Sequence, residues 1–282
     1  MNISKKFSLK NKIAIITGGN GLLGSTYSYG LHEVGAKIIV LDKKINKNKF
    51  FDFIKKEFNA DLTDSKNIQF IECDITNKKS VDASFKKISF DLNKLEILIN
   101  NASLVKQIGT DKLDSTYIPF LKMKKEDWEE YFSVDLTGTL HLCQKVIPYM
   151  QKNSGGGSII NISSTYGILS PDQRLYSSLS KKTFEDIEKP IGYSVSKSGI
   201  LNLTRFLATK FASQNIRVNT LTLGGVYANN PEQFVKEYSL KTPLGRMADK
   251  SEYIGPMIFL ASNASSYMTG SNLIVDGGWS AW

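Results

Sequence analysis

Residues 13–24 read IAIITGGNGLLG, an apolar run that leads directly into a glycine-rich turn. The run Ile13–Thr17 is continuously apolar and rich in β-branched residues, which is typical of a parallel strand covered on both faces. Beyond the turn, apolar residues recur with helical spacing from Leu23 to Val34, and Gly35 follows as a stop signal. The stretch therefore predicts a strand, a tight turn and a helix in direct succession.

The same alternation of strand-like and helix-like segments continues along the rest of the chain. Six further runs have strand character: Lys37–Asp42, Ile68–Asp74, Leu95–Asn100, Ser158–Ser163, Arg217–Leu223 and Asn272–Val275. Strands that alternate with helices form a parallel sheet with right-handed crossovers, and 282 residues can fold as one such unit. We therefore expect an α/β single-domain Rossmann fold over residues 1–282, a doubly wound parallel sheet of about seven strands with helices on both faces.

The composition is that of an ordinary globular protein, with 41% hydrophobic and 22% charged residues. A net charge of +9 comes from 36 Lys and Arg against 27 Asp and Glu. The lysines are scattered in short pairs without interleaved aromatic residues, which favours a solvated surface over nucleic-acid binding. A basic surface would still help to recruit a phosphorylated substrate.

The two cysteines, Cys73 and Cys143, are too few for a disulfide framework or a zinc site. Free thiols fit a reducing compartment. The sequence contains no run of 18 apolar residues, and its first residues lack the apolar region of a signal peptide. We therefore expect a cytoplasmic protein without a membrane partner.

The glycine turn has the features of a dinucleotide-binding site. Its glycines allow the backbone to turn sharply and to approach a pyrophosphate, which then lies at the positive N-terminus of the following helix. A turn that follows a strand and precedes a helix is the context that such a motif requires. The candidate cofactor residues in this stretch are Gly18, Asn20, Gly21, Leu22, Leu23 and Gly24.

Carboxylates end the next two strands. Asp42 lies eighteen residues beyond Gly24, where it can accept hydrogen bonds from both hydroxyls of the adenosine ribose and repel a 2′-phosphate. NAD is therefore the expected cofactor and NADP is less favoured, although Lys43 and Lys44 partly offset the repulsion. Asp74 is placed to hydrogen-bond the adenine amino group.

Tyr193 and Lys197 form the strongest catalytic pair in the sequence. On a helix, a spacing of four residues puts the phenol and the ammonium on one face. An adjacent ammonium favours the phenolate, which makes Tyr193 usable as a general acid and base. Ser164 follows the fifth strand at the same edge of the sheet and could bind a substrate oxygen. The neighbouring Ser163 is the alternative.

Together these motifs resemble the short-chain dehydrogenase/reductase family over nearly the whole chain. The matching stretches are the glycine turn at 17–24, Asp74, Asn100–Ala102, Ser164, Tyr193 with Lys197, Arg217–Asn219 and Asp276–Gly278. The resemblance implies that Ser164 orients the substrate oxygen, that Tyr193 transfers the proton, and that Lys197 holds the nicotinamide ribose and tunes Tyr193. The cofactor contacts implied outside the turn are Asp42, Asp74, Ile75, Asn101, Ala102, Tyr193, Lys197, Gly224, Gly225 and Val226. The expected reaction is the NAD(P)-dependent interconversion of a secondary alcohol and a ketone.

Several positions depart from the pattern of that family. Asp135 stands where the fourth catalytic residue is usually Asn, and a buried carboxylate near Lys197 would alter the charge balance of the site. Ser103, Leu223 and Ala228 replace the Gly, Pro and Thr that are usual at their positions. The spacing of the three glycines also resembles the extended, sugar-nucleotide branch of the family more than the compact branch.

Residues 103–125 and 165–192 are longer than simple connections and leave from the carboxyl ends of strands, so we expect inserted loops near the substrate cleft. The second stretch carries Arg174, which could bind a phosphate or a carboxylate, and Thr165 is a further substrate candidate. The insertion resembles family members from bacterial surface-glycan and flagellin-modification pathways. A hydroxyl of a sugar or sugar phosphate is therefore the hypothesised substrate.

Other functional classes find less support. A hydrolase is disfavoured because His32 and His141 lie in predicted helices and no G-x-S-x-G turn occurs, and no metal site is expected. An NAD-dependent sugar epimerase or dehydratase and a non-catalytic dinucleotide-binding regulatory protein remain as alternatives. Trp279 and Trp282 stand near the end of the chain, where subunits of the family often pack, so a homo-oligomer, either a tetramer or a dimer, is expected.

Overall fold

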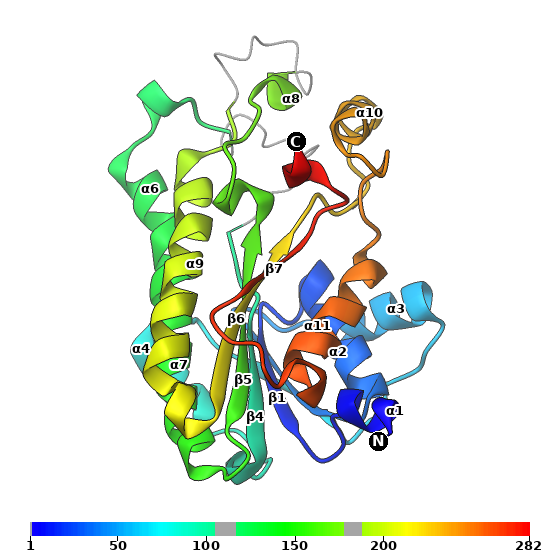
Figure 1. Ribbon diagram of the computed structural model, residues 1–282, viewed down its shortest axis with the longest axis vertical. Coiled ribbons are helices and arrows are strands. Elements are labelled where there is room, and N and C mark those ends of the chain that lie inside the picture. Colours follow the sequence, from blue (N-terminus) through cyan, green and yellow to red (C-terminus); the bar gives the residue numbers. More distant parts are fainter. Residues whose placement is uncertain (1, 105–116, 178–187) are drawn as a thin grey trace.

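Seven parallel strands form the centre of the computed structural model, which describes residues 2–104, 117–177 and 188–282 (Figure 1). The strands are β1 Ile13–Thr17, β2 Lys37–Asp42, β3 Ile68–Glu72, β4 Leu95–Asn100, β5 Gly157–Ser164, β6 Ile216–Leu223 and β7 Asn272–Val275. Their bounds confirm the predicted ones closely. The main difference is that β3 ends two residues early, because Asp74 accepts a hydrogen bond from the Thr76 amide at 3.0 Å and turns the chain.

The sheet has the order β3-β2-β1-β4-β5-β6-β7. The strand β1 pairs with β2 on one side and β4 on the other, so Ile16 lies beside both Val40 and Ile99. From β1 to β3 each strand lies further toward one edge of the sheet, and from β4 to β7 each lies further toward the other edge. The strand order therefore reverses between β1 and β4. In sheets of this kind a crevice opens at the carboxyl side of the reversal, which makes it the expected place for a ligand.

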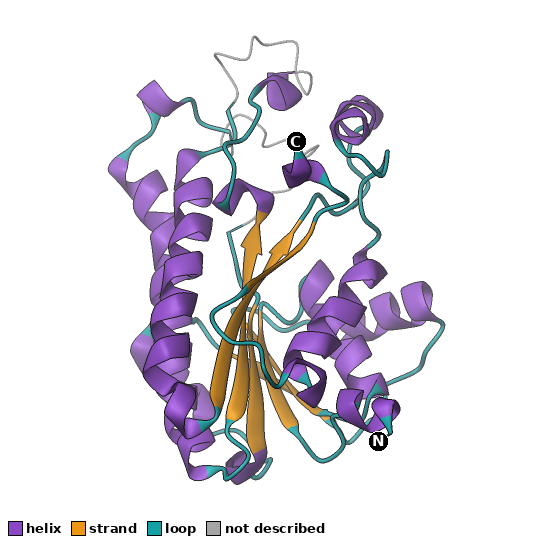
Figure 2. Cartoon of the chain, in the orientation of Figure 1, coloured by secondary structure: helices purple, strands orange, loops and turns teal. Residues whose placement is uncertain are grey.

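Helices cover both faces of the sheet, as predicted (Figure 2). One face carries α2 Leu22–Glu33, α3 Lys47–Phe58 and α11 Ile254–Ala261, and the other carries α4 Lys78–Phe85, α7 Thr139–Lys152 and α9 Ile191–Phe211. Tyr27 and Met257 are fully buried on the first face, and Leu142 and Val146 on the second. Continuous apolar strands are stable here because neither side of the sheet meets water.

The remaining helices include α1 Ile3–Phe7, α6 Lys125–Phe132, α8 Arg174–Ser177 and α10 Glu232–Lys241. In Figure 1, α8, α10 and the C-terminus gather beyond the carboxyl ends of the strands. Buried aromatic residues join these segments into one cluster, in which the ring of Tyr238 stacks on Trp279 with 4.2 Å between centroids. This cluster forms a roof over the edge of the sheet where the site lies.

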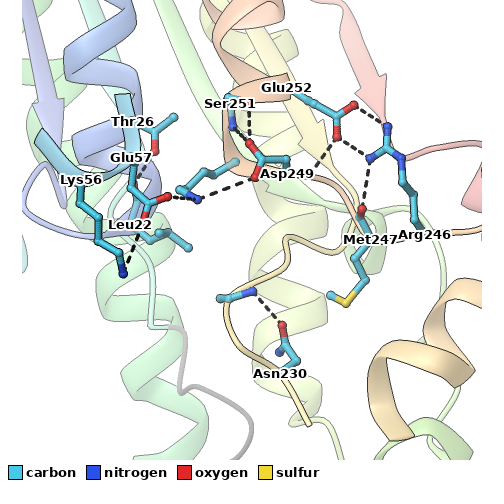
Figure 3. Close-up of polar contacts among 12 residues, drawn as sticks. Leu22, Thr26, Lys56, Glu57, Asn230, Arg246, Met247, Asp249, Ser251 and Glu252 are labelled. Carbon is cyan, nitrogen blue, oxygen red and sulfur yellow. Dashed lines mark hydrogen bonds and ion pairs between the residues drawn. The ribbon is translucent and has the colours of Figure 1, made fainter. Parts of the chain in front are cut away.

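An ion-pair network links the segment after β6 to α3 (Figure 3). The Lys250 ammonium lies 2.8 Å from Glu57 of α3 and 3.8 Å from Asp249. Asp249 and Glu252 form a capping box on the short helix η6 Lys250–Tyr253, and Glu252 also accepts two hydrogen bonds from Arg246. The network therefore ties one side of the site to the helix layer.

The cysteines and histidines occupy structural positions. Cys73 and Cys143 are buried and free, as the sequence indicated. His32 contacts the Ser65 hydroxyl at 3.0 Å, and His141 contacts the carbonyl of Ile75 at 2.9 Å. Within the described ranges, no helix combines the length and apolar character needed to cross a membrane.

Candidate active site

The glycine turn packs so closely on neighbouring backbone that no side chain would fit at two of its glycines. Gly18 has a φ of +60°, and a Cβ there would lie 2.9 Å from the Cα of Ala102. A Cβ on Gly24 would lie 2.2 Å from the carbonyl oxygen of Gly18. The helix α2 begins directly after Gly21, whose position has no side-chain cap, so the first amides of the helix are free of a local side-chain acceptor. This cradle fits a pyrophosphate at a helix N-terminus.

The end of β4 holds the turn in place. The Asn101 side chain donates to the carbonyls of Thr17 and Gly18 at 3.0 and 3.2 Å. The amides of Asn101 and Ala102 both donate to the Thr17 hydroxyl at 3.1 Å. These contacts join two strands at the point where the strand order reverses, which fixes the shape of the cradle.

Asp42 and Asp74 lie along the same edge, as predicted. The Asp42 carboxylate accepts a hydrogen bond from the Asn20 amide at 3.0 Å, which fixes it against the glycine turn. Asp74 forms an ion pair with Lys43 at 3.1 Å. The carboxylates, the turn and the amide cluster around Asn101 therefore fit a nicotinamide dinucleotide.

A cavity of about 630 Å³ extends from the glycine turn across the carboxyl ends of β4, β5 and β6. Sixteen of the predicted site residues line it, and they are Gly18, Gly21, Leu22, Leu23, Asp42, Asp74, Ile75, Asn101, Ala102, Ser164, Thr165, Tyr193, Lys197, Gly224, Gly225 and Val226. Asn20, Gly24 and Asp135 lie behind this lining and support it through the contacts described here. The cavity joins the cofactor cradle to the candidate catalytic residues.

Tyr193 and Lys197 lie on α9, one turn apart. The Lys197 ammonium lies 5.8 Å from the centroid of the Tyr193 ring and donates to the carbonyl of Ile162 at 3.1 Å. The Ser164 side chain shares a hydrogen bond with Tyr193, whereas Ser163 donates its hydroxyl to the carbonyl of Lys197 at 2.9 Å. The structure therefore joins Ser164, and not Ser163, to the phenol.

Asp135 lies behind this group, in the π-helical turn η3 Ser133–Gly138. Its side chain is fully buried; one oxygen accepts a hydrogen bond from the Ser196 hydroxyl at 2.5 Å, and the other lies 3.8 Å from the Lys197 ammonium. Burial raises the pKa of Tyr193 to about 12, the hydrogen bond with Ser164 lowers it, and the charge of Asp135 raises it. The carboxylate thus opposes ionisation of the phenol.

Lys189 is a site residue that the sequence did not reveal. Its half-buried side chain lines the cavity, and its ammonium lies 4.2 Å from the centroid of the Tyr193 ring. The residue precedes α9, so helical spacing gave no reason to place it beside the phenol. Its position four residues before Tyr193 was the only available signal.

The aromatic roof supplies further residues that the sequence analysis did not assign to the site. Tyr166, Tyr176, Phe234 and Tyr238 all line the cavity. The Tyr176 hydroxyl donates to Tyr166 at 3.0 Å, and the Tyr238 hydroxyl accepts from the Gly225 amide at 2.6 Å. These residues come from three separate segments, so only packing brings them together.

Arg174 does not reach the cavity. Its side chain is 80% exposed, and its guanidinium donates two hydrogen bonds to Asp172, at 2.8 and 2.9 Å. Lys241 of α10 binds the same carboxylate. Parts of both expected insertions, at 105–116 and 178–187, lie outside the described residues.

Comparisons with known proteins agree with this arrangement. Residues 23–280 match the family model described as enoyl-(acyl carrier protein) reductase. The chain is 28% identical to D-arabinitol 2-dehydrogenase [ribulose-forming] of Scheffersomyces stipitis, over 100% of this chain and 98% of that protein. It is 25% identical to 2-dehydro-3-deoxy-D-gluconate 5-dehydrogenase of Escherichia coli, over 99% of each. It is also 28% identical to post-translational flagellin modification protein A of Campylobacter coli, over 96% of this chain and 99% of that protein.

Solved structures show the same fold with nucleotides bound. A short-chain dehydrogenase from Leptospira borgpetersenii with bound NAD+ has a TM-score of 0.80 at 32% identity, covering 99% of this chain and 96% of that one. A gluconate 5-dehydrogenase from Burkholderia cenocepacia in complex with NADP and tartrate has a TM-score of 0.80 at 25% identity, with each chain fully covered. This chain therefore belongs to the short-chain dehydrogenase/reductase family of NAD(P)-dependent oxidoreductases, which interconvert CH–OH and carbonyl groups.

Proposed function

We propose that this protein interconverts a secondary hydroxyl and a ketone on a sugar-derived, polyhydroxylated substrate, with NAD as its preferred cofactor. The observation that carries the proposal is the group Ser164, Tyr193 and Lys197, which faces a cavity continuous with the glycine cradle. The named activities of the arabinitol and deoxygluconate relatives support a polyhydroxylated substrate. Ser164 and Lys189, which line the cavity beside Tyr193, supply polar groups for such a substrate.

Each catalytic side chain has a distinct task in this proposal. Ser164 holds the substrate oxygen, and the Tyr193 phenolate takes the hydroxyl proton during oxidation or returns it during reduction. The Lys197 ammonium, held by the Ile162 carbonyl, stabilises the phenolate through its charge. When bound, the nicotinamide ring supplies the hydride acceptor for oxidation or the hydride donor for reduction. Lys197 would hold the nicotinamide ribose, and the glycine turn before α2 would hold the pyrophosphate.

The preference for NAD rests on Asp42. Its carboxylate is fixed by the Asn20 amide at the end of β2, where a 2′-phosphate on the adenosine would meet a negative charge. The nearby Lys43 ammonium is directed to Asp74, 3.1 Å away. It is therefore less able to offset that repulsion.

The proposed reaction is tested with five- and six-carbon alditols, aldonic acids and sugar phosphates as substrates, following NADH formation and, separately, NADPH formation. Tyr193→Phe is expected to lower kcat by about 10²- to 10⁴-fold while the affinity for NADH is retained. Tyr267→Phe, at a fully exposed tyrosine, is the matched control. Unchanged turnover in Tyr193→Phe would contradict the assignment. If the wild type binds NADH but turns over none of these substrates, a regulatory role would be favoured. If the product is formed without net oxidation or reduction, an epimerase or dehydratase would be favoured.

The assembly and location are part of the same proposal. Trp282 is 78% exposed at the end of the chain, three residues after Trp279 of the buried aromatic cluster, and an exposed indole there favours a contact between subunits. We propose a homo-oligomer, either a tetramer or a dimer, that works in the cytoplasm, where the free thiols of Cys73 and Cys143 would stay reduced. Light scattering of the purified protein measures the oligomeric state, and a monomeric mass would contradict it.

A further inference from the structure

Two lysines face one phenol in the cavity, and their surroundings differ. The Lys197 ammonium has a carbonyl acceptor at 3.1 Å and the Asp135 carboxylate at 3.8 Å. Among the described residues, the Lys189 ammonium has no carboxylate within ion-pair distance and no hydrogen-bond acceptor; its contact is with the face of the Tyr193 ring. The immediate surroundings of Tyr193 therefore contain two ammonium groups and one buried carboxylate.

The position of Lys189 is well defined by its backbone. The Gln173 side chain accepts a hydrogen bond from the Lys189 amide at 2.7 Å and donates one to the Lys189 carbonyl at 3.2 Å. Pro190 follows and caps α9, so the lysine stands at the entrance of the helix that carries Tyr193. This double contact directs the side chain toward the reacting centre.

The ammonium is kept in the cavity at a cost. Burial lowers the pKa of Lys189 to about 8, the charge of Asp135 raises it, and the charge of Lys197 lowers it. A desolvated charge without a partner is unfavourable, and an anionic ligand removes that penalty. Glu130 also lines the cavity, but its exposed carboxylate lies beyond ion-pair distance of Lys189.

The same cavity contains polar groups that lack partners. The Tyr117 side chain is 1% exposed and its hydroxyl has no hydrogen-bond partner among the described residues. The buried Ser103 hydroxyl also has no hydrogen-bond partner among the described residues. Both residues line the cavity. Buried hydroxyls are normally hydrogen-bonded, so these two indicate a ligand that brings hydroxyl groups of its own.

We propose that Lys189 binds the carboxylate of a hydroxy acid derived from a sugar, whose secondary hydroxyl faces Tyr193. The inference deepens the proposed function and rests on it for the identity of the reacting hydroxyl. One ammonium matches the single negative charge of a carboxylate, whereas a phosphate dianion would need a second cation. Lys189 thus sets the class of substrate, and the Ser164–Tyr193–Lys197 group sets the chemistry.

The kinetic test compares each aldonic acid with the alditol of the same carbon skeleton. The wild type should use the acid with a kcat/KM at least about tenfold higher. Lys189→Met should raise KM for the acid by about 10- to 100-fold more than it raises KM for the alditol, and should change kcat for the two substrates by the same factor. Lys189→Arg, which keeps the positive charge, should have a KM for the acid between those of the wild type and Lys189→Met. Lys210→Met, at an exposed lysine near the end of α9, is the matched control.

A binding measurement separates this inference from the proposed reaction. Calorimetry of gluconate with the NADH-bound enzyme needs no turnover, and its affinity should fall by about 10- to 100-fold in Lys189→Met. If alditols are oxidised and acids are not preferred, the reaction stands and the inference is wrong. If nothing is oxidised, Lys189-dependent binding of gluconate still supports the inference, and absence of binding refutes it. An equal loss for acid and alditol in Lys189→Met, or a preference for sugar phosphates, also refutes it.

Discussion

Side chains from four different segments surround a single residue, Tyr193. Ser164 ends β5, Lys197 lies on α9, Asp135 lies in η3, and Lys189 lies in the chain before α9. The hydrogen bond with Ser164 lowers the pKa of the phenol, whereas burial and the charge of Asp135 raise it. The balance among these effects decides the pH at which the tyrosine can work.

Asp135→Asn tests that balance, because it removes a negative charge and keeps the size of the side chain. Since Asp135 raises the pKa of Tyr193, its loss should lower that pKa. The phenolate needed for alcohol oxidation would then form at lower pH, so the rising limb of the kcat/KM profile should move toward lower pH. Ser196→Ala removes the hydrogen bond to Asp135 without removing the charge and should shift the limb less. A limb that stays in place would show that Asp135 does not act on the phenol.

At the scale of elements, the close contact between β1 and α2 is what shapes the cofactor cradle. Gly24, in the first turn of α2, packs on the carbonyl of Gly18, so the helix begins directly beside the strand end. The chain can approach a pyrophosphate only because no side chain stands between these two segments.

Gly24→Ala is expected to weaken cofactor binding. A methyl group would lie 2.2 Å from the Gly18 oxygen, and overpacking of this kind costs about 1–3 kcal/mol. The dissociation constant for NADH, followed by fluorescence, should rise about tenfold or more. Gly255→Ala in α11 is the control, because a Cβ there has no heavy atom within 4 Å. Equal affinities for NADH in the two variants would mean that α2 can shift to make room for the methyl group without weakening cofactor binding.

The contact between α3 and the segment after β6 is a second element-scale feature. Lys250→Met removes an ammonium with a 15% exposed side chain that joins Glu57 to Asp249 (Figure 3). The free energy of unfolding should fall by about 1 kcal/mol, measured in urea. Lys56→Met provides the comparison, since Lys56 is 83% exposed and lies 4.0 Å from Glu57. If Lys56→Met lowers the free energy of unfolding as much as Lys250→Met does, the burial of Lys250 does not account for its contribution to stability.

For the whole molecule, the site draws on nearly every strand of the sheet. The carboxyl ends of β1, β2 and β4 form the cradle, and those of β5 and β6 lie beside the catalytic group (Figure 1). A ligand that spans this edge contacts both halves of the sheet. Binding should therefore stabilise the fold as a unit and not only one loop.

Thermal unfolding tests this coupling. NADH at a hundred times its dissociation constant should add about 2.7 kcal/mol, which raises Tm by about 5–10 °C for a chain of this size. NADPH at the same concentration should raise Tm less, because Asp42 would face the 2′-phosphate. A larger shift with NADPH would overturn the preference for NAD, and no shift with either would contradict the cofactor site.

The strands, the cradle and the pair Tyr193 and Lys197 could be predicted from the sequence because each depends on local rules. Buried parallel strands require continuous apolar runs, the cradle requires glycines between a strand and a helix, and a spacing of four residues on a helix joins two side chains. These patterns do not depend on which distant segment packs nearby. The family membership followed from the same local motifs.

Only the tertiary structure could decide which side chains share the cavity. It separated Ser164 from Ser163, because neighbouring residues at a strand end point in different directions. It directed Arg174 to Asp172 and away from the cleft, and it brought Lys189 to the face of Tyr193. Such outcomes depend on packing between segments far apart in the sequence and on competition among nearby charges, which no local pattern of residues encodes.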